Sequence, residues 1–83
     1  MDFEVALPGG KTVRVFDQRI YGLWDSHERT IAVDDRQTEE ERLNTLIHEA
    51  LHALAPQWGE QRVSDNADFV AAILWKAGYR RRK

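Results

Sequence analysis

The chain of 83 residues is long enough for one domain, and a domain of this size buries only about 60% of the surface that its unfolded chain exposes. Because it contains no cysteine, disulfides, cysteine-ligated zinc sites and thiol nucleophiles are excluded, and any metal ligands must be His, Asp or Glu. Hydrophobic content of 42%, charged content of 31% and a net charge of −2 exclude intrinsic disorder and a broadly basic nucleic-acid-binding surface, and no apolar run is long enough to cross a bilayer.

Four short strands are predicted at the start of the chain. Phe3, Val5 and Leu7 alternate with less apolar residues, as in a half-buried strand, and the Pro-Gly-Gly sequence at 8–10 predicts a turn. Alternation resumes after this turn, which predicts a β-hairpin, and a second hairpin with a polar tip follows. The predicted strands are 3–7, 11–17, 21–24 and 29–33.

Two helices are predicted after the strands. The first begins at Thr38, whose hydroxyl can accept the backbone N–H of Glu41 while the Glu41 carboxylate reaches back, as in a capping box. Apolar residues at helical spacing continue this helix until Pro56 ends it. The second helix is predicted over 59–77, with Gly78 as its C-cap.

Strands followed by helices predict an α+β fold, with a small antiparallel β-sheet of three to four strands followed by two packed helices. We expect residues 1–79 to form a single domain. Residues 80–83 form a basic tail of charge +4, against −6 for the rest of the chain, and we expect from it only non-specific contacts with nucleic acid. The first residues lack the basic and apolar segments of a signal peptide, so we expect a cytoplasmic protein without membrane association.

The first predicted helix contains His48-Glu49-Ala50-Leu51-His52, an H-E-x-x-H motif. Side chains four residues apart share one helix face, with about 5–6 Å between their Cβ atoms. Both imidazoles can therefore bind one zinc ion at about 2.0–2.1 Å each. Glu49 is offset from the metal by one residue, which leaves it close enough to accept a proton from a water that zinc activates. We interpret His48 and His52 as zinc ligands and Glu49 as the catalytic base.

A third protein ligand is needed, because catalytic zinc sites usually combine three protein ligands with a water. His27, the remaining histidine, lies in the polar tip of the second hairpin, where side chains are commonly solvated. Glu60 lies on the apolar stripe of the second helix, and a carboxylate facing a protein core needs a partner such as a cation. Asp68, at the edge of that stripe, is the alternative, as a ligand or as an acceptor for a histidine N–H. We favour Glu60.

The chain resembles the ImmA/IrrE-like zinc metallopeptidases over roughly residues 21–77. Members share a G-L-Y-D-like hairpin, matched here by Gly22-Leu23-Trp24-Asp25, then an S/T-x-E-E cap and a T-L-x-H-E-x-x-H helix, matched at 38–41 and 45–52. The resemblance implies a minimal zincin-like fold of the glutamate-ligand type, with Glu60 as the third ligand, and a setting in phages or mobile elements. Two features differ: only seven residues separate His52 from Glu60, and a predicted hairpin replaces the N-terminal helix of the family.

The expected function is zinc-dependent hydrolysis of a peptide or protein substrate. Candidates for stabilising the oxyanion or contacting the substrate are Tyr21, His27 and Tyr79. An extended peptide is expected to pair with the strand that ends at Val33. The alternative is a non-catalytic binding or regulatory module in which zinc staples a small fold. Glu49 argues against that alternative, because a purely structural site needs only its ligands.

Overall fold

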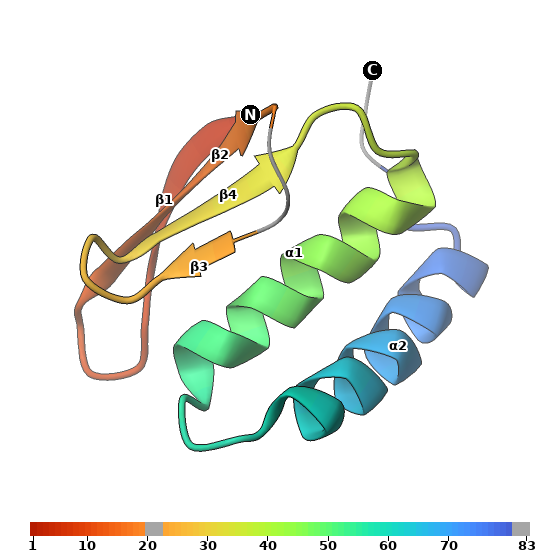
Figure 1. Ribbon diagram of the computed structural model, residues 1–83. Coiled ribbons are helices and arrows are strands. Elements are labelled where there is room, and N and C mark those ends of the chain that lie inside the picture. The colour runs from red at the N-terminus through yellow and green to blue at the C-terminus, as the bar shows by residue number, and fades with distance from the viewer. Residues whose placement is uncertain (20–22, 81–83) are drawn as a thin grey trace.

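The computed structural model describes residues 1–19 and 23–80, and it confirms the α+β fold, with one sheet followed by two helices (Figure 1). The strands lie side by side in the order β1-β2-β4-β3. Among the described residues, neither helix has the length and apolar character needed to cross a bilayer. The elements are β1 (Asp2–Ala6), β2 (Thr12–Gln18), β3 (Leu23–Asp25), β4 (Thr30–Asp34), α1 (Glu39–Leu54) and α2 (Glu60–Lys76).

The sheet is mixed, so the prediction of an antiparallel sheet was wrong in this detail. The pairs β1–β2 and β3–β4 are antiparallel, as the two predicted hairpins require, whereas β2 and β4 pair in parallel. The parallel register sets Val15 beside Ile31 and buries both of them. Alternation along the chain identifies each hairpin, but it does not say how two hairpins join. As a result β4 is an interior strand and β3 lies at one edge of the sheet.

The apolar core lies between the sheet and α1. Val13, Val15, Ile31 and Val33 form its buried cluster, against which Leu46 of α1 packs. Helix α1 lies across β3 and β4, and α2 packs against α1 rather than against the sheet (Figure 1). The molecule is therefore layered as sheet, α1 and α2, with α1 in the middle.

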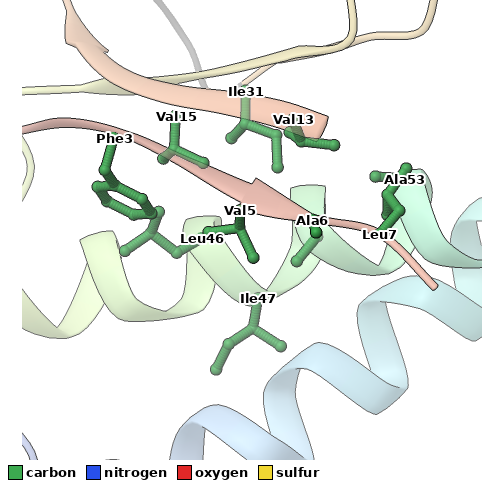
Figure 2. Close-up of a pocket in the computed structure, with 11 residues that line it drawn as sticks. Phe3, Val5, Ala6, Leu7, Val13, Val15, Ile31, Leu46, Ile47 and Ala53 are labelled. Atoms are coloured by element: carbon green, nitrogen blue, oxygen red, sulfur yellow. The ribbon is translucent and has the colours of Figure 1, made fainter. Parts of the chain in front are cut away.

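Helix α1 leaves the other half of the sheet less well covered. A hollow of about 350 Å³, lined by apolar side chains, lies between β1, β2 and α1 (Figure 2). Phe3 and Val5 of β1 point toward α1 across this hollow, yet they remain 44% and 52% exposed. Their exposure shows how little apolar cover so short a chain can provide.

The start of α1 is fixed as the sequence predicted. Thr38 is the N-cap, its hydroxyl accepts the N–H of Glu41, and the Glu41 carboxylate accepts the N–H of Thr38 in return. This confirms the predicted capping box. At the far end of α2 the C-cap is Ala77 rather than the predicted Gly78, which follows it with a φ of 94°, a left-handed conformation in which glycine avoids the Cβ strain of other residues.

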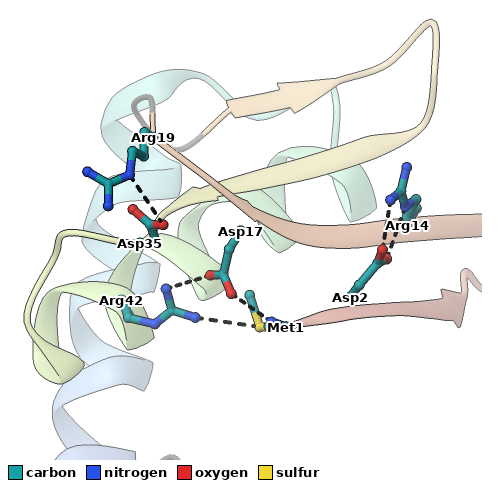
Figure 3. A network of polar contacts seen from close by, with 7 residues as sticks. All are labelled: Met1, Asp2, Arg14, Asp17, Arg19, Asp35 and Arg42. Atoms are coloured by element: carbon teal, nitrogen blue, oxygen red, sulfur yellow. Dashed lines mark hydrogen bonds and ion pairs between the residues drawn. The ribbon is translucent and has the colours of Figure 1, made fainter.

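A buried ion pair connects α1 to the sheet (Figure 3). Arg42 is only 3% exposed, and its Nη1 donates to Asp17 Oδ1 of β2 at 2.7 Å. The Met1 amino group donates to the other oxygen of Asp17, also at 2.7 Å. Burial acts to raise the pKa of Asp17, but the hydrogen bonds from the amino group and from Arg42 outweigh it and lower the pKa. Because each charge has a partner, Arg42 can be buried without an unpaired charge.

Asp34, at the end of β4, gives the protein a stability that depends on pH. Its carboxylate accepts hydrogen bonds of 2.9 Å from the side chain and the backbone N–H of Arg36, which lower its pKa from 3.8 to about 2. A depressed folded-state pKa stabilises the fold above the unfolded pKa of about 3.9, and this contribution is lost as the pH falls through about 2. We expect the melting temperature to fall between about pH 4 and pH 2.

Thermal unfolding followed by circular dichroism tests this expectation. Asp34→Asn should lower the melting temperature at pH 7 and reduce its change between about pH 4 and pH 2. Asp35→Asn is the matched control, because it removes the same charge from an exposed neighbour that lies 3.9 Å from Arg19. Equal pH profiles for Asp34→Asn and the wild type would contradict this role of Asp34.

Candidate metal centre

Two histidines of α1 face the same point in space. His48 and His52 are four residues apart, so their side chains lie on one flank of the helix. Their ring centroids are 4.9 Å apart, and their Nε2 atoms lie 3.2 Å from each other. Two ring nitrogens turned toward each other in this way are arranged to share one proton or one cation.

Glu60 brings a carboxylate to the same point. A linker at 55–59, which contains Pro56, reverses the chain after α1, and Glu60 is the first residue of α2. Glu60 Oε1 lies 2.7 Å from His48 Nε2, and Oε2 lies 3.0 Å from His52 Nε2. The structure therefore brings together the three side chains that the sequence predicted as ligands.

These three side chains could together hold a metal ion. Bonds of about 2.0–2.1 Å in tetrahedral geometry separate neighbouring ligand atoms by about 3.3 Å. One ligand atom from each side chain lies within 4.8 Å of the other two, so small side-chain movements would bring the three atoms to the separation that a shared ion requires. Over residues 1–19 and 23–80, this is the one group of three or more His, Asp or Glu side chains with the spacing of a metal site.

The prediction for Glu60 was right about its position and wrong about its burial. The carboxylate was expected to face the core, but the side chain is 67% exposed, while His48 and His52 are 21% and 24% exposed. Farther along the same stripe, Val63 and Ala67 are fully buried against α1. Glu60 lies one turn before Val63, at the start of α2. There its side chain is outside the apolar core and faces the rings of His48 and His52.

Glu49 lies beside this cluster without belonging to it. It is only 8% exposed, and it borders a hollow of about 300 Å³ that is also lined by the three candidate ligands and by Leu23 and Trp24 of β3. Burial raises the pKa of Glu49, while His48, His52 and the backbone amide of Trp24 act in the opposite direction. A raised carboxyl pKa suits proton transfer near neutral pH.

The structure separates the other predicted candidates from this cluster. Asp68 accepts a hydrogen bond from Asn44 Nδ2 at 2.9 Å and is not one of the grouped donors. His27 lies in the turn between β3 and β4, where its backbone N–H donates to Asp25, and it is not in the group either. Tyr79 follows the C-terminal end of α2, whose 17 residues span about 25 Å from Glu60. Tyr21 falls outside the described residues.

No pattern in the sequence predicted that β3 would border the site. Trp24 lies there because β3 is the edge strand against which α1 packs, and this placement depends on the parallel pairing of β2 with β4. The strand that ends at Val33 cannot take up a peptide as expected, because β4 is paired on both sides. Among the described strands, the edge strand next to the cluster is β3.

No protein-family model matches this chain, and no curated protein or solved structure matches it. The resemblance to the ImmA/IrrE-like metallopeptidases therefore depends on the residues of this chain alone.

Proposed function

We propose that this protein is a zinc-dependent metallopeptidase. The observation that carries the proposal is the pairing of two features: three donor groups, from His48, His52 and Glu60, that converge on one point, and a fourth group, Glu49, that is buried beside them without being one of the donors. A hydrolytic zinc site needs three protein ligands, an open position and a nearby general base, and the three donors with Glu49 support that proposal.

The residues have distinct roles in this proposal. His48, His52 and Glu60 hold the metal, and a bound zinc ion supplies Lewis acidity that activates water and polarises a peptide carbonyl. Glu49 accepts the proton of the attacking water and delivers it to the leaving amine. β3 is the edge strand beside Glu49, and an extended peptide can lie along it.

A non-catalytic zinc-stapled module is the second candidate, and one observation favours it. Helix α2 packs against α1 alone, so a metal held by His48, His52 and Glu60 would cross-link the least supported element of the fold. Glu49 distinguishes the two candidates. Burial raises the pKa of Glu49 in the metal-free protein, and a purely structural site gives no reason to bury a carboxyl group beside the donors.

Metal analysis tests the proposal directly. The purified protein is expected to bind about one zinc ion per chain, and Glu60→Ala is expected to weaken zinc binding by more than about 100-fold, since it removes a ligand. Asp65→Ala is the matched control, because it removes an exposed carboxylate of α2 that bonds only to Gln61 among the contacts shown. Absence of zinc binding by the wild type would refute the proposal, and unchanged binding by Glu60→Ala would assign the third ligand elsewhere.

A further inference from the structure

A polar seam runs along the contact between the two helices. On α1, Asn44 and His48 lie on the same flank, one turn apart, and on α2 Glu60 and Asp68 lie two turns apart. Because the short linker makes the helices antiparallel, the His48–Glu60 contact lies at one end of the seam and the Asn44–Asp68 contact at the other. Asn44 Nδ2 donates to Asp68 Oδ1 at 2.9 Å.

The apolar side chains between α1 and α2 only weakly determine the register, that is, the position of α2 along and around α1. The buried residues of α2 are Val63, Ala67 and Ala71, which are 0%, 0% and 6% exposed. Such small side chains form shallow ridges, so sliding or turning one helix against the other meets less steric resistance than it would between large side chains. A directional hydrogen bond between the helices does oppose such a movement.

The position of the Glu60 carboxylate depends on the register of α2 on α1. Its side chain is 67% exposed, so core packing does not hold it, and its two oxygens must reach two different histidines at 2.7 and 3.0 Å. A shift of α2 by a single residue, about 1.5 Å along its axis, would break that double contact. The placement of α2 therefore decides whether the three donors converge.

We infer that the Asn44–Asp68 hydrogen bond fixes the register of α2 on α1 and thereby positions Glu60 in the metal cluster. Asn44 and Asp68 are then positioning residues, since neither is among the grouped donors. The inference rests on the proposed function, because it assumes that His48, His52 and Glu60 bind a metal. It gives Asp68 a role different from both roles expected from the sequence, a ligand and an acceptor for a histidine N–H.

Zinc affinity, measured by competition with a chelating dye, tests the inference. Asn44→Ala and Asp68→Ala should each weaken zinc binding about fivefold, the effect of losing one hydrogen bond. The double variant should also be about fivefold weaker, because both changes remove the same contact. Asp68→Asn keeps an acceptor for Asn44 while losing the charge, so its affinity should stay near that of the wild type.

Two controls separate positioning from charge and from general stability. Asp65→Ala removes a carboxylate from the same helix without touching the seam, and it should bind zinc like the wild type. Asn44→Ala should change the visible absorption of bound Co²⁺, which reports coordination geometry, while the metal-free protein melts at the same temperature as the Asp65→Ala control. A merely structural role would lower the melting temperature and leave the spectrum of bound Co²⁺ unchanged.

The outcomes distinguish this inference from the proposed function. If the wild type binds zinc and Asn44→Ala binds it equally well, the inference is wrong and the proposed metal centre stands. If Asp68→Asn loses as much affinity as Asp68→Ala, the charge of Asp68 matters rather than its hydrogen bond, and the inference is again wrong. If the wild type binds neither Zn²⁺ nor Co²⁺, the proposed function fails first.

Discussion

Replacing Glu49 with glutamine is expected to leave zinc affinity close to that of the wild type and to lower peptide hydrolysis by about 10²–10⁴-fold, the usual contribution of a general base. Glutamine has nearly the same shape, and Glu49 is not among the three grouped donors, so the metal cluster should be unaffected. The amide cannot accept the proton of the attacking water. Hydrolysis of a fluorogenic peptide library, with zinc content measured on the same samples, checks both expectations.

The same substitution has a second effect in the metal-free protein. Burial raises the folded-state pKa of Glu49, so its contribution to stability is favourable below the unfolded pKa and is lost as the pH rises through the folded value. Glutamine carries no charge at any pH in this range. The melting temperature of Glu49→Gln should therefore exceed that of the wild type by a margin that grows from about pH 4 upward.

Two results would contradict this assignment. A Glu49→Gln protein that hydrolyses peptides as fast as the wild type would exclude Glu49 as the base. A Glu49→Gln protein that loses zinc would show that the carboxylate takes part in binding the metal. Wild-type protein treated with a chelator is the control, because any hydrolysis that survives chelation belongs to a contaminating peptidase.

Removing zinc is expected to lower the melting temperature by at least about 10 °C. A ligand present at 100 times its Kd stabilises the folded state by about 2.7 kcal/mol, and each kcal/mol shifts the melting temperature of a domain this small by about 4–8 °C. The effect should be large because the cluster joins α1 to α2, which lacks support from the sheet. Thermal unfolding at a fixed excess of free zinc, compared with unfolding after a chelator has removed the zinc, measures the shift.

A variant that cannot bind the metal separates zinc removal from other effects of the chelator. His48→Ala removes one donor from a side chain that is only 21% exposed, and its melting temperature should not respond to zinc or to the chelator. Equal chelator effects on His48→Ala and the wild type would mean that the shift does not come from this cluster. No change in the wild type would rule out a metal that stabilises the fold.

The local structure was predictable from the sequence because short-range patterns determine it. The capping box at Thr38 needs only residues three apart, and the H-E-x-x-H spacing places His48 and His52 on one flank of any helix. Glu60 could also be named, because it lies on the apolar stripe of the second helix and therefore on the side that faces the first. These features depend on a few neighbouring residues, and the structure has all of them.

The remaining features depend on contacts that no local pattern records. The parallel pairing of β2 with β4 joins residues far apart in the chain, and it alone makes β3 an edge strand and brings Trp24 to the cluster. The exposure of Glu60 likewise depends on where α1 ends relative to α2. A helical wheel assigns a direction to each side chain, but it cannot tell whether another element lies in that direction.

Helix α2 supplies one of the three grouped donors from its first residue and packs on α1 alone, so the three donors lie together only while α2 is docked. Docking of the helix and capture of a metal are then two coupled equilibria, and each favours the other by the same free energy. In metal-free protein, α2 is the element expected to detach first, with amide exchange faster than that of the sheet. If zinc is the metal, the concentration of free zinc would set the fraction of chains in which α2 is docked and Glu60 lies beside His48 and His52.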